Sequence, residues 1–178
     1  MNGNSAFLLK KEFLCMDIQF KKVSDFDRGI LLDLLTDAYS FDCRYEQNCN
    51  SDWQAFDDFF FDNLHIADKY GFVTMLNDEA IGFISWDLRN MPAYAEIGHN
   101  CIATKHKGNG YGKAQLREAV NRIIQNKVEK IIVTTNSDLI PAQRMYEHIG
   151  FTMCPQRKEQ DSMVFEHIYY EYMCDQLF

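Results

Sequence analysis

The segment KHKGNGYGKAQL, residues 105–116, constrains the fold most, because it places glycines at three alternate positions between a strand-like run and a helix-like run. A strand, a glycine-rich turn and a helix direct backbone N–H groups and the positive end of a helix dipole toward one point, which favours an anion. Gly108, Gly110 and Gly112 lack the β-carbons that would hold a phosphate away from the backbone. The segment therefore predicts a phosphate site at the start of a helix.

Two familiar phosphate loops are excluded by spacing. A P-loop requires G-x-x-x-x-G-K, but Lys107 stands where its first glycine would fall. A dinucleotide fingerprint requires G-x-G-x-x-G, but Lys113 stands where its third glycine would fall. A tight turn with close helix packing and no ligand remains an alternative for the glycines alone.

Hydrophobic periodicity predicts an α/β fold with a mixed sheet and helices on its faces. Ser24 or Asp25 is expected to cap the first helix, and Asp52 the second, after a polar loop over 42–51. Asn77 and Asp78 fit a hairpin turn. The expected elements are a strand over 17–23, a helix near 30–38, a helix from 52, strands over 70–76, 80–88 and 95–103, a helix over 110–126, a strand over 130–136, a helix over 139–149 and strands within 151–156 and 163–174.

Composition limits the class of protein. With 178 residues, 47% of them apolar, the chain can bury the core of one domain, expected over 16–178 after a loosely held extension over 1–15. No apolar run approaches the roughly 20 residues of a membrane span. A net charge of −8 without a basic cluster argues against nucleic acid as a partner. Six cysteines without metal-ligand spacing predict reduced thiols, no metal site and a cytoplasmic location.

Two sequence blocks resemble signatures of one family. The first, Ile102-x-Thr104-x-x-Lys107-Gly108-Asn109-Gly110-Tyr111-Gly112, is similar to the acetyl-CoA signature V-x-P-x-x-R/Q-G-x-G-x-G/A of the GNAT family of N-acetyltransferases. The second, Asn136 followed by Pro141-Ala142, Tyr146 and Gly150-Phe151, resembles the family's N-x-x-A-x-x-x-Y-x-x-x-G-F block with a longer gap. Thr104 and Lys107 depart from the pattern, which has proline and Arg or Gln there.

The resemblance implies a mostly antiparallel sheet splayed between its fourth and fifth strands, flanked by about four helices. It also implies acetyl-CoA as co-substrate, with the pantetheine arm along the strand before the loop, the pyrophosphate on the loop's N–H groups, and Asn136 on the pantetheine where the sheet splays. The cofactor-binding residues implied in this way are Cys101, Ile102, Ala103, Lys107, Gly108, Asn109, Gly110, Tyr111, Gly112, Lys113, Asn136 and Ala142.

Transfer of an acetyl group to an alkylamine requires a base, because an ammonium with a pKa of about 10.4 must first lose a proton. Glu96 matches the position of the family's catalytic glutamate, and His99 is the second choice. Strict alternation places Glu96 and Asn100 on one face of the strand, and His99 and Cys101 on the other. Tyr146 matches the tyrosine that protonates the departing thiolate. Cys101 activated by His99 is a covalent alternative.

The predicted function is transfer of acetyl from acetyl-CoA to a primary amine of a small molecule or peptide, by direct attack in a ternary complex. A non-catalytic acyl-CoA sensor and an unrelated nucleotide-binding protein remain alternatives, and homodimerisation is left open. The acids Asp57, Asp58 and Asp62 fit either a solvated helix face or a lining that attracts an amine. The sequence does not identify the acceptor.

Overall fold

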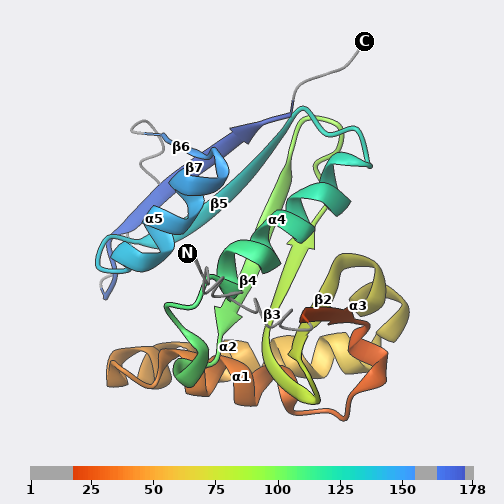
Figure 1. The fold of residues 1–178 in the computed structure, drawn as a ribbon, viewed down its shortest axis with the longest axis vertical. Coiled ribbons are helices and arrows are strands. Elements are labelled where there is room, and N and C mark those ends of the chain that lie inside the picture. The colour runs from red at the N-terminus through yellow and green to blue at the C-terminus, as the bar shows by residue number, and fades with distance from the viewer. Residues whose placement is uncertain (1–17, 155–163, 175–178) are drawn as a thin grey trace, which may run out of the picture.

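The computed structural model describes residues 18–154 and 164–174, so the predicted extension over 1–15 lies outside the described residues. One seven-stranded sheet runs through the molecule (Figure 1). Its strands are β1 (Ile18–Lys21), β2 (Gly71–Leu76), β3 (Glu79–Asp87), β4 (Ala95–Ile102), β5 (Lys130–Asn136), β6 (Thr152–Met153) and β7 (His167–Met173). The helices are α1 (Ile30–Tyr39), α2 (Cys43–Asp62), α3 (Leu64–Tyr70), α4 (Tyr111–Ile124) and α5 (Ile140–Ile149), with short 3₁₀ turns η1 (Val23–Asp25) and η2 (Thr104–His106).

The sheet has the order β1-β2-β3-β4-β5-β7-β6, and every pair is antiparallel except β4 with β5. That parallel pairing is short, because it joins only Ala95, Ile97 and the residue between them to β5. Beyond these residues the two strands diverge, as the separating halves of the sheet show in Figure 1. The predicted splay between the fourth and fifth strands is therefore confirmed.

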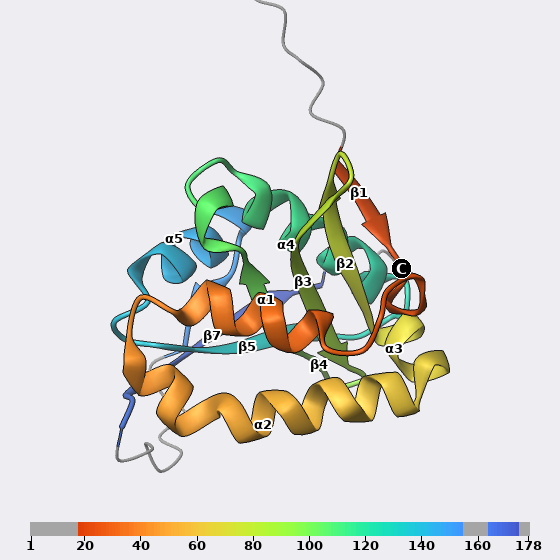
Figure 2. The same ribbon diagram turned by 90° about the horizontal axis from the view of Figure 1, so that it is seen from below.

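Two apolar clusters cover the two faces of the sheet. One joins α4 and α5 to the sheet around Leu116, Ile131 and Tyr170, and the other joins α1 and α2 around Leu31, Phe83 and their neighbours. Figure 2 shows α1 and α2 on one side of the strands, with α4 and α5 on the other. Helices therefore close both faces, which leaves the diverging edges of β4 and β5 as the place where a long ligand could lie between them.

The predicted helix starts were wrong in the first third of the chain. α1 begins at Ile30, because the buried carboxylate of Asp57 accepts hydrogen bonds from the N–H groups of Gly29, Leu31 and Leu32 at 2.9–3.3 Å. Neither Ser24 nor Asp25 caps it: Ser24 bonds Asp68, and Asp25 lies in η1.

α2 is longer than predicted. The region 42–51 was expected to be a loop, but α2 already begins at Cys43, with Asp42 accepting the Arg44 N–H at 3.0 Å as its cap. Asp52 is consequently an interior helix residue. The predicted second helix is also interrupted at Asn63, and the separate helix α3 follows it. The described residues therefore contain five α-helices, where about four were expected.

The acids of α2 serve structure. Asp57 is fully buried under the start of α1, while Asp58 and Asp62 both pair with Arg28, Asp58 at 2.8 Å. These carboxylates therefore fasten α2 to the segment before α1, rather than forming a free acidic face. Within residues 18–154 and 164–174, no helix is both long enough and apolar enough to cross a membrane.

Candidate active site

The three glycines of the segment meet two different structural needs. Gly108 and Gly110 have positive φ angles of 79° and 88°, in the region that residues with a β-carbon resist. Gly112 lies inside α4, where an added β-carbon would stand 3.0 Å from Met145 Sδ and 3.5 Å from Ile102 Cγ1. Two glycines therefore shape the turn, and the third allows α4 to approach α5.

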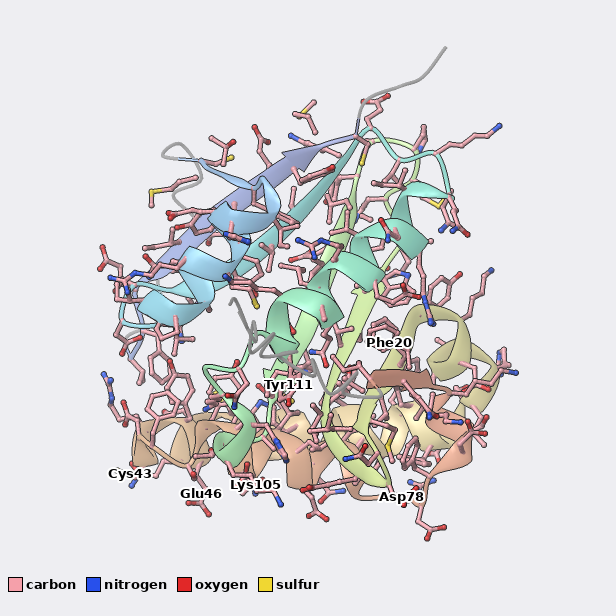
Figure 3. The ribbon with its side chains drawn as sticks, viewed as in Figure 1. Phe20, Cys43, Glu46, Asp78, Lys105 and Tyr111 are labelled. Carbon is pink, nitrogen blue, oxygen red and sulfur yellow. The ribbon has the colours of Figure 1, made fainter. Side chains whose placement is uncertain are left out.

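Backbone donors at this turn remain available to an anion. The N–H groups of Lys107 and Lys113 donate to Thr104 O at 3.3 Å and Gly110 O at 3.1 Å, but those of Gly108 and Gly110 have no acceptor among the described residues. They precede the first turn of α4, whose start Tyr111 marks in Figure 3. The dipole of this helix and the unused donors together suit a phosphate.

Thr104 and Lys107, the two residues that differ from the family pattern, both bond to α1. Thr104 donates its backbone N–H to Asp37 Oδ2 at 2.6 Å and its hydroxyl to Asp37 O at 2.7 Å. The Lys107 ammonium donates to Ala38 O and lies 5.0 Å from the centre of the Phe41 ring, and burial lowers the pKa of this group. The side chain of Lys107 therefore supports the C-terminal end of α1, and the anion site depends on backbone groups.

The edge of β4 that faces β5 is unpaired beyond Ile97 in the described part of the chain. On its other edge, Cys101 and Ile102 pair with Phe83 and Gly82 of β3, and Ala103 N–H donates to Ile81 O at 2.7 Å. An extended chain with amide groups could therefore add to the open edge by strand-like hydrogen bonds. This is where the pantetheine arm is expected.

A bulge in β4 corrects the predicted faces. Ile97 pairs with Trp86 and Asn100 pairs with Ile84, so β4 advances three residues while β3 advances two. An extra residue inverts the alternation beyond it. Asn100 therefore contacts Tyr146 on the α5 side, whereas Glu96 and His99 line one pocket on the α2 side. The prediction that Glu96 shares a face with Asn100 was wrong.

The pocket on the α2 side has a volume of about 570 Å³ and lies between α2, α3, β3 and β4. Its helix side is apolar, with Phe56, Phe59, Phe60, Ile66 and Tyr70. Its strand side contributes Ser85, Trp86, Asp87, Arg89, Glu96, Gly98 and His99. A carboxylate at a pocket wall, beside the bulge of β4, can accept a proton from a ligand in that pocket.

Burial separates the candidate bases. His99 packs edge-on against Phe56, with ring centres 4.4 Å apart, and burial lowers its pKa to about 4. Burial therefore disfavours the charged imidazolium that His99 would become as a base, and Glu96, a carboxylate at the pocket wall, stays the first choice. Burial raises the pKa of the Cys101 thiol to about 12, which removes the thiolate that a covalent mechanism would need.

Tyr146 ends a buried chain of hydrogen bonds across the interior. Thr74 donates its hydroxyl to Gln115 Oε1 at 2.6 Å, and Gln115 Nε2 donates to Phe83 O at 2.9 Å and to Asn100 Oδ1 at 2.8 Å. The carbonyl of Phe83 can only accept, so the Gln115 atom that faces it must be the amide nitrogen. This nitrogen also donates to Asn100, so the Asn100 atom that faces Gln115 must be the amide oxygen. Asn100 Nδ2 then faces the Tyr146 hydroxyl at 3.5 Å.

The direction of this chain matters for acid chemistry. Asn100 presents a donor to the phenol oxygen, so the proton of Tyr146 is left to point toward another acceptor. Tyr146 is 4% exposed, and burial raises its pKa, which keeps the phenol protonated at neutral pH. The side chain is therefore suited to donate a proton to a leaving group.

Asn136 lies at the end of β5, on the opposite side of the splay from β4. Its Nδ2 donates to the Tyr45 hydroxyl at 2.9 Å, and its backbone carbonyl accepts from Gln143 Nε2 at 3.1 Å. Ala142 lies in α5 and packs at the margin of the core. These contacts hold the end of β5 against α2 and α5.

Family membership follows from a match that covers most of the chain. Residues 31–151 match the model of the acetyltransferase (GNAT) family. The chain belongs to the GNAT family. The resemblance of the two sequence blocks is thereby confirmed.

Three known proteins resemble this GNAT protein at low sequence identity. A mycothiol acetyltransferase from Corynebacterium aurimucosum is 27% identical over 71 residues, which cover 40% of this chain and 23% of that protein, so the match spans less than a quarter of the curated relative. Among solved structures, the PaiA N-acetyltransferase of Thermoplasma acidophilum, in complex with coenzyme A, has a TM-score of 0.71 at 14% identity, covering 89% of this chain and 99% of that one. The ribosomal-protein-S18-alanine N-acetyltransferase of Escherichia coli has a TM-score of 0.64 at 15% identity, covering 90% and 97%. These likenesses show the fold.

Several residues of the site were missed from sequence. Tyr39 ends α1, and its pKa is raised by burial and further by the nearby Tyr146 and Cys101. Asn100 and Gln115 connect Tyr146 to the interior. Gln115 lies among the apolar residues on the buried face of α4. A polar residue in that position was the signal in the sequence that could have revealed this chain of hydrogen bonds.

Proposed function

We propose that this protein is an N-acetyltransferase that transfers acetyl from acetyl-CoA to a primary amine by direct attack in a ternary complex. The observation that carries the proposal is the arrangement around β4. Glu96 lines a pocket on one face of the strand. On the other face, Asn100 donates a hydrogen bond to the Tyr146 hydroxyl. The open strand edge and the glycine turn continue from the same strand, so the co-substrate would extend along it.

Each residue has a balanced role in the proposed reaction. Glu96 takes one proton from the ammonium, directly or through water, and the loss of this proton at pH 7 costs about 4–5 kcal/mol. The amine nitrogen then forms a bond to the carbonyl carbon, and the bond from that carbon to sulfur breaks. Tyr146 donates its proton to the departing sulfur, and the second proton that the nitrogen loses on becoming an amide returns to Tyr146, directly or through water. Glu96 releases the first proton to solvent. Backbone N–H groups around Gly108 and Gly110 would hold the pyrophosphate.

The proposal is tested by the release of CoA thiol, measured with purified protein, acetyl-CoA and a panel of primary amines. We expect release above background for at least one amine. The Glu96→Gln variant should lose rate chiefly below the pKa of the amine, and a pH–rate profile identical to that of the wild type would eliminate Glu96 as the base.

The same assay separates the alternatives. Tight acetyl-CoA binding with no CoA release for any amine would support the sensor. Thermal stabilisation by NAD or ATP but not by CoA would instead support an unrelated nucleotide-binding protein. The cytoplasmic location and the identity of residues that touch the co-substrate stay predictions.

A further inference from the structure

A tyrosine of α2 determines which atom of Asn136 is available to a ligand in the opening between β4 and β5. We infer that Tyr45 is a positioning residue for CoA, because it orients the Asn136 side chain so that Oδ1 can accept an N–H group of the pantetheine arm. This role rests on the proposed function, in which CoA occupies that opening. Figure 2 shows the start of α2, the helix that contains Tyr45, on the same side of the molecule as the end of β5.

Asn136 lies where the sheet has opened. The last pairing between β4 and β5 joins Ile97 to Val133, and Asn136 is three residues, or roughly 10 Å, farther along β5. An extended arm that adds to the open edge of β4 would therefore pass the end of β5, and the amide groups of that arm carry N–H donors. A hydrogen-bond acceptor at this end of β5 would bind the arm from the side opposite β4.

A chain of hydrogen bonds determines which end of the Asn136 amide remains for a ligand. The Asp138 carboxylate accepts from Arg44 Nη2 at 2.9 Å and from the Tyr45 hydroxyl at 3.5 Å. Because a carboxylate can only accept, the proton of Tyr45 is used there, and the phenol oxygen must accept from Asn136, at 2.9 Å. The Asn136 atom that faces Tyr45 is therefore the amide nitrogen, which leaves Oδ1 directed elsewhere.

Oδ1 is an acceptor of Asn136 that remains available. The backbone carbonyl of this residue already accepts from Leu139 N–H at 3.1 Å and from Gln143 Nε2 at 3.1 Å. Oδ1 accepts no hydrogen bond from the residues that the structure describes, although Asn136 is only partly exposed. A side chain oriented before the ligand arrives can accept its N–H group without first having to reorganise.

The packing of Tyr45 holds its hydroxyl in place for this role. Tyr45 is 3% exposed, and its ring stacks on that of Phe165 with ring centres 4.5 Å apart and lies 4.8 Å from the ring of Tyr39. These contacts involve the ring and not the hydroxyl, so Tyr45→Phe keeps them. The substitution removes the acceptor of Asn136 Nδ2, after which the amide can rotate and present its nitrogen, which cannot accept an N–H group, to the ligand.

Calorimetry with two ligands tests the role. CoA carries the pantetheine arm, whereas 3′-phospho-ADP is the part of CoA without that arm. Tyr45→Phe should weaken CoA binding about fivefold, which corresponds to about one hydrogen bond, and leave 3′-phospho-ADP binding unchanged. Tyr170→Phe is the matched control, because it removes the hydroxyl of another buried tyrosine that donates to a carboxylate, Glu147 at 3.0 Å, and it should leave both affinities unchanged. Equal losses for the two ligands in Tyr45→Phe, or no loss for CoA, would overturn the positioning role.

A double variant separates an action through Asn136 from direct contact between Tyr45 and CoA. Asn136→Ala should weaken CoA binding at least as much as Tyr45→Phe, and the double variant should bind CoA no more weakly than Asn136→Ala alone. Additive losses would show that Tyr45 does not act through Asn136.

The outcomes for the positioning role and for the proposed function are distinguishable. If the affinities follow the expected pattern but no amine releases CoA thiol from acetyl-CoA, the positioning role stands and the proposed transfer falls. If acetyl is transferred but Tyr45→Phe leaves CoA affinity unchanged, the proposed function stands and the positioning role falls. A wild-type protein that binds no CoA would overturn both.

Discussion

Replacing Tyr146 by Phe tests the proposed acid directly. The change removes one hydroxyl, whose contact among the described residues is Asn100 Nδ2 at 3.5 Å. A hydrogen bond this long contributes little, so the free energy of unfolding should fall by less than about 1 kcal/mol. The ring contacts with Phe151 and Tyr170, both at 5.8 Å between ring centres, are retained. Any large loss of activity would therefore come from chemistry and not from unfolding.

The size of the loss follows from the leaving group. A thiol with a pKa of about 8.5 that departs unprotonated at pH 7 costs about 1.5 pKa units, or roughly 2 kcal/mol, which is about 30-fold in rate. We expect kcat of Tyr146→Phe to fall by about that factor at pH 7. The deficit should shrink above pH 8.5, because a thiolate is then stable without the donated proton.

The assay is CoA thiol release at saturating acetyl-CoA and amine, between pH 6 and 9. Tyr170→Phe is the matched control, because Tyr170 is buried in the same cluster but donates its hydroxyl to Glu147 at 3.0 Å. It should lose stability and keep kcat within about twofold. A Tyr146→Phe enzyme with wild-type kcat at pH 7, or with a deficit that is constant across this range, would refute the role as acid.

Three further changes test the parts around the site. Gly110→Val places a branched residue at a φ of 88°, and calorimetry should show CoA affinity reduced at least 10-fold with most of the fold retained. Asp57→Ala leaves three N–H groups at the start of α1 without their acceptor and should lower the free energy of unfolding, measured with denaturant, by about 2–4 kcal/mol. The matched change Asp58→Ala, at a partly exposed residue, should lower it by less than about 1 kcal/mol. Burial lowers the pKa of His99 to about 4, so as the pH falls the unfolded chain takes up this proton before the folded protein does. The free energy of unfolding of the wild type should therefore fall by up to about 3 kcal/mol between pH 6.5 and 4. His99→Leu should lack this part of the fall, as denaturant unfolding at each pH would show.

The sheet and the glycine turn could be predicted from sequence because their signals are local. The alternating runs that became β2 and β3 flank Asn77, which has the positive φ of 54° that a tight turn favours. The start of α4 follows from glycines whose freedom the turn requires. Such patterns depend on a few neighbouring residues, so they need no knowledge of what packs against them.

The helix starts could not be predicted because their caps come from far along the chain. The N–H groups that open α1 bond Asp57, which is 26 residues beyond Leu31. Within a few residues before the helix, the sequence offers Ser24 and Asp25, which are both residue types that commonly cap helices. Neither of them caps α1 in the structure. Likewise, the polar composition of 42–51 favoured a loop, yet Asp42 supplies a local cap and Tyr45 and Trp53 supply the buried side that holds α2 as a helix.

The bulge of β4 explains why strict alternation failed and how one strand can serve two chemical roles. A regular strand would place Glu96 and Asn100 on the same face, so the proposed base and the residue that contacts the proposed acid would lie on one side of the sheet. Because β4 contains one extra residue between Ile97 and Asn100, Glu96 borders the pocket beside α2 while Asn100 contacts Tyr146 on the side of α5. In the proposed reaction, a proton would be taken from the amine on one face of the strand and given to the sulfur on the other, with the carbonyl between them at the open edge. Deleting the extra residue should therefore abolish transfer even in a protein that still folds.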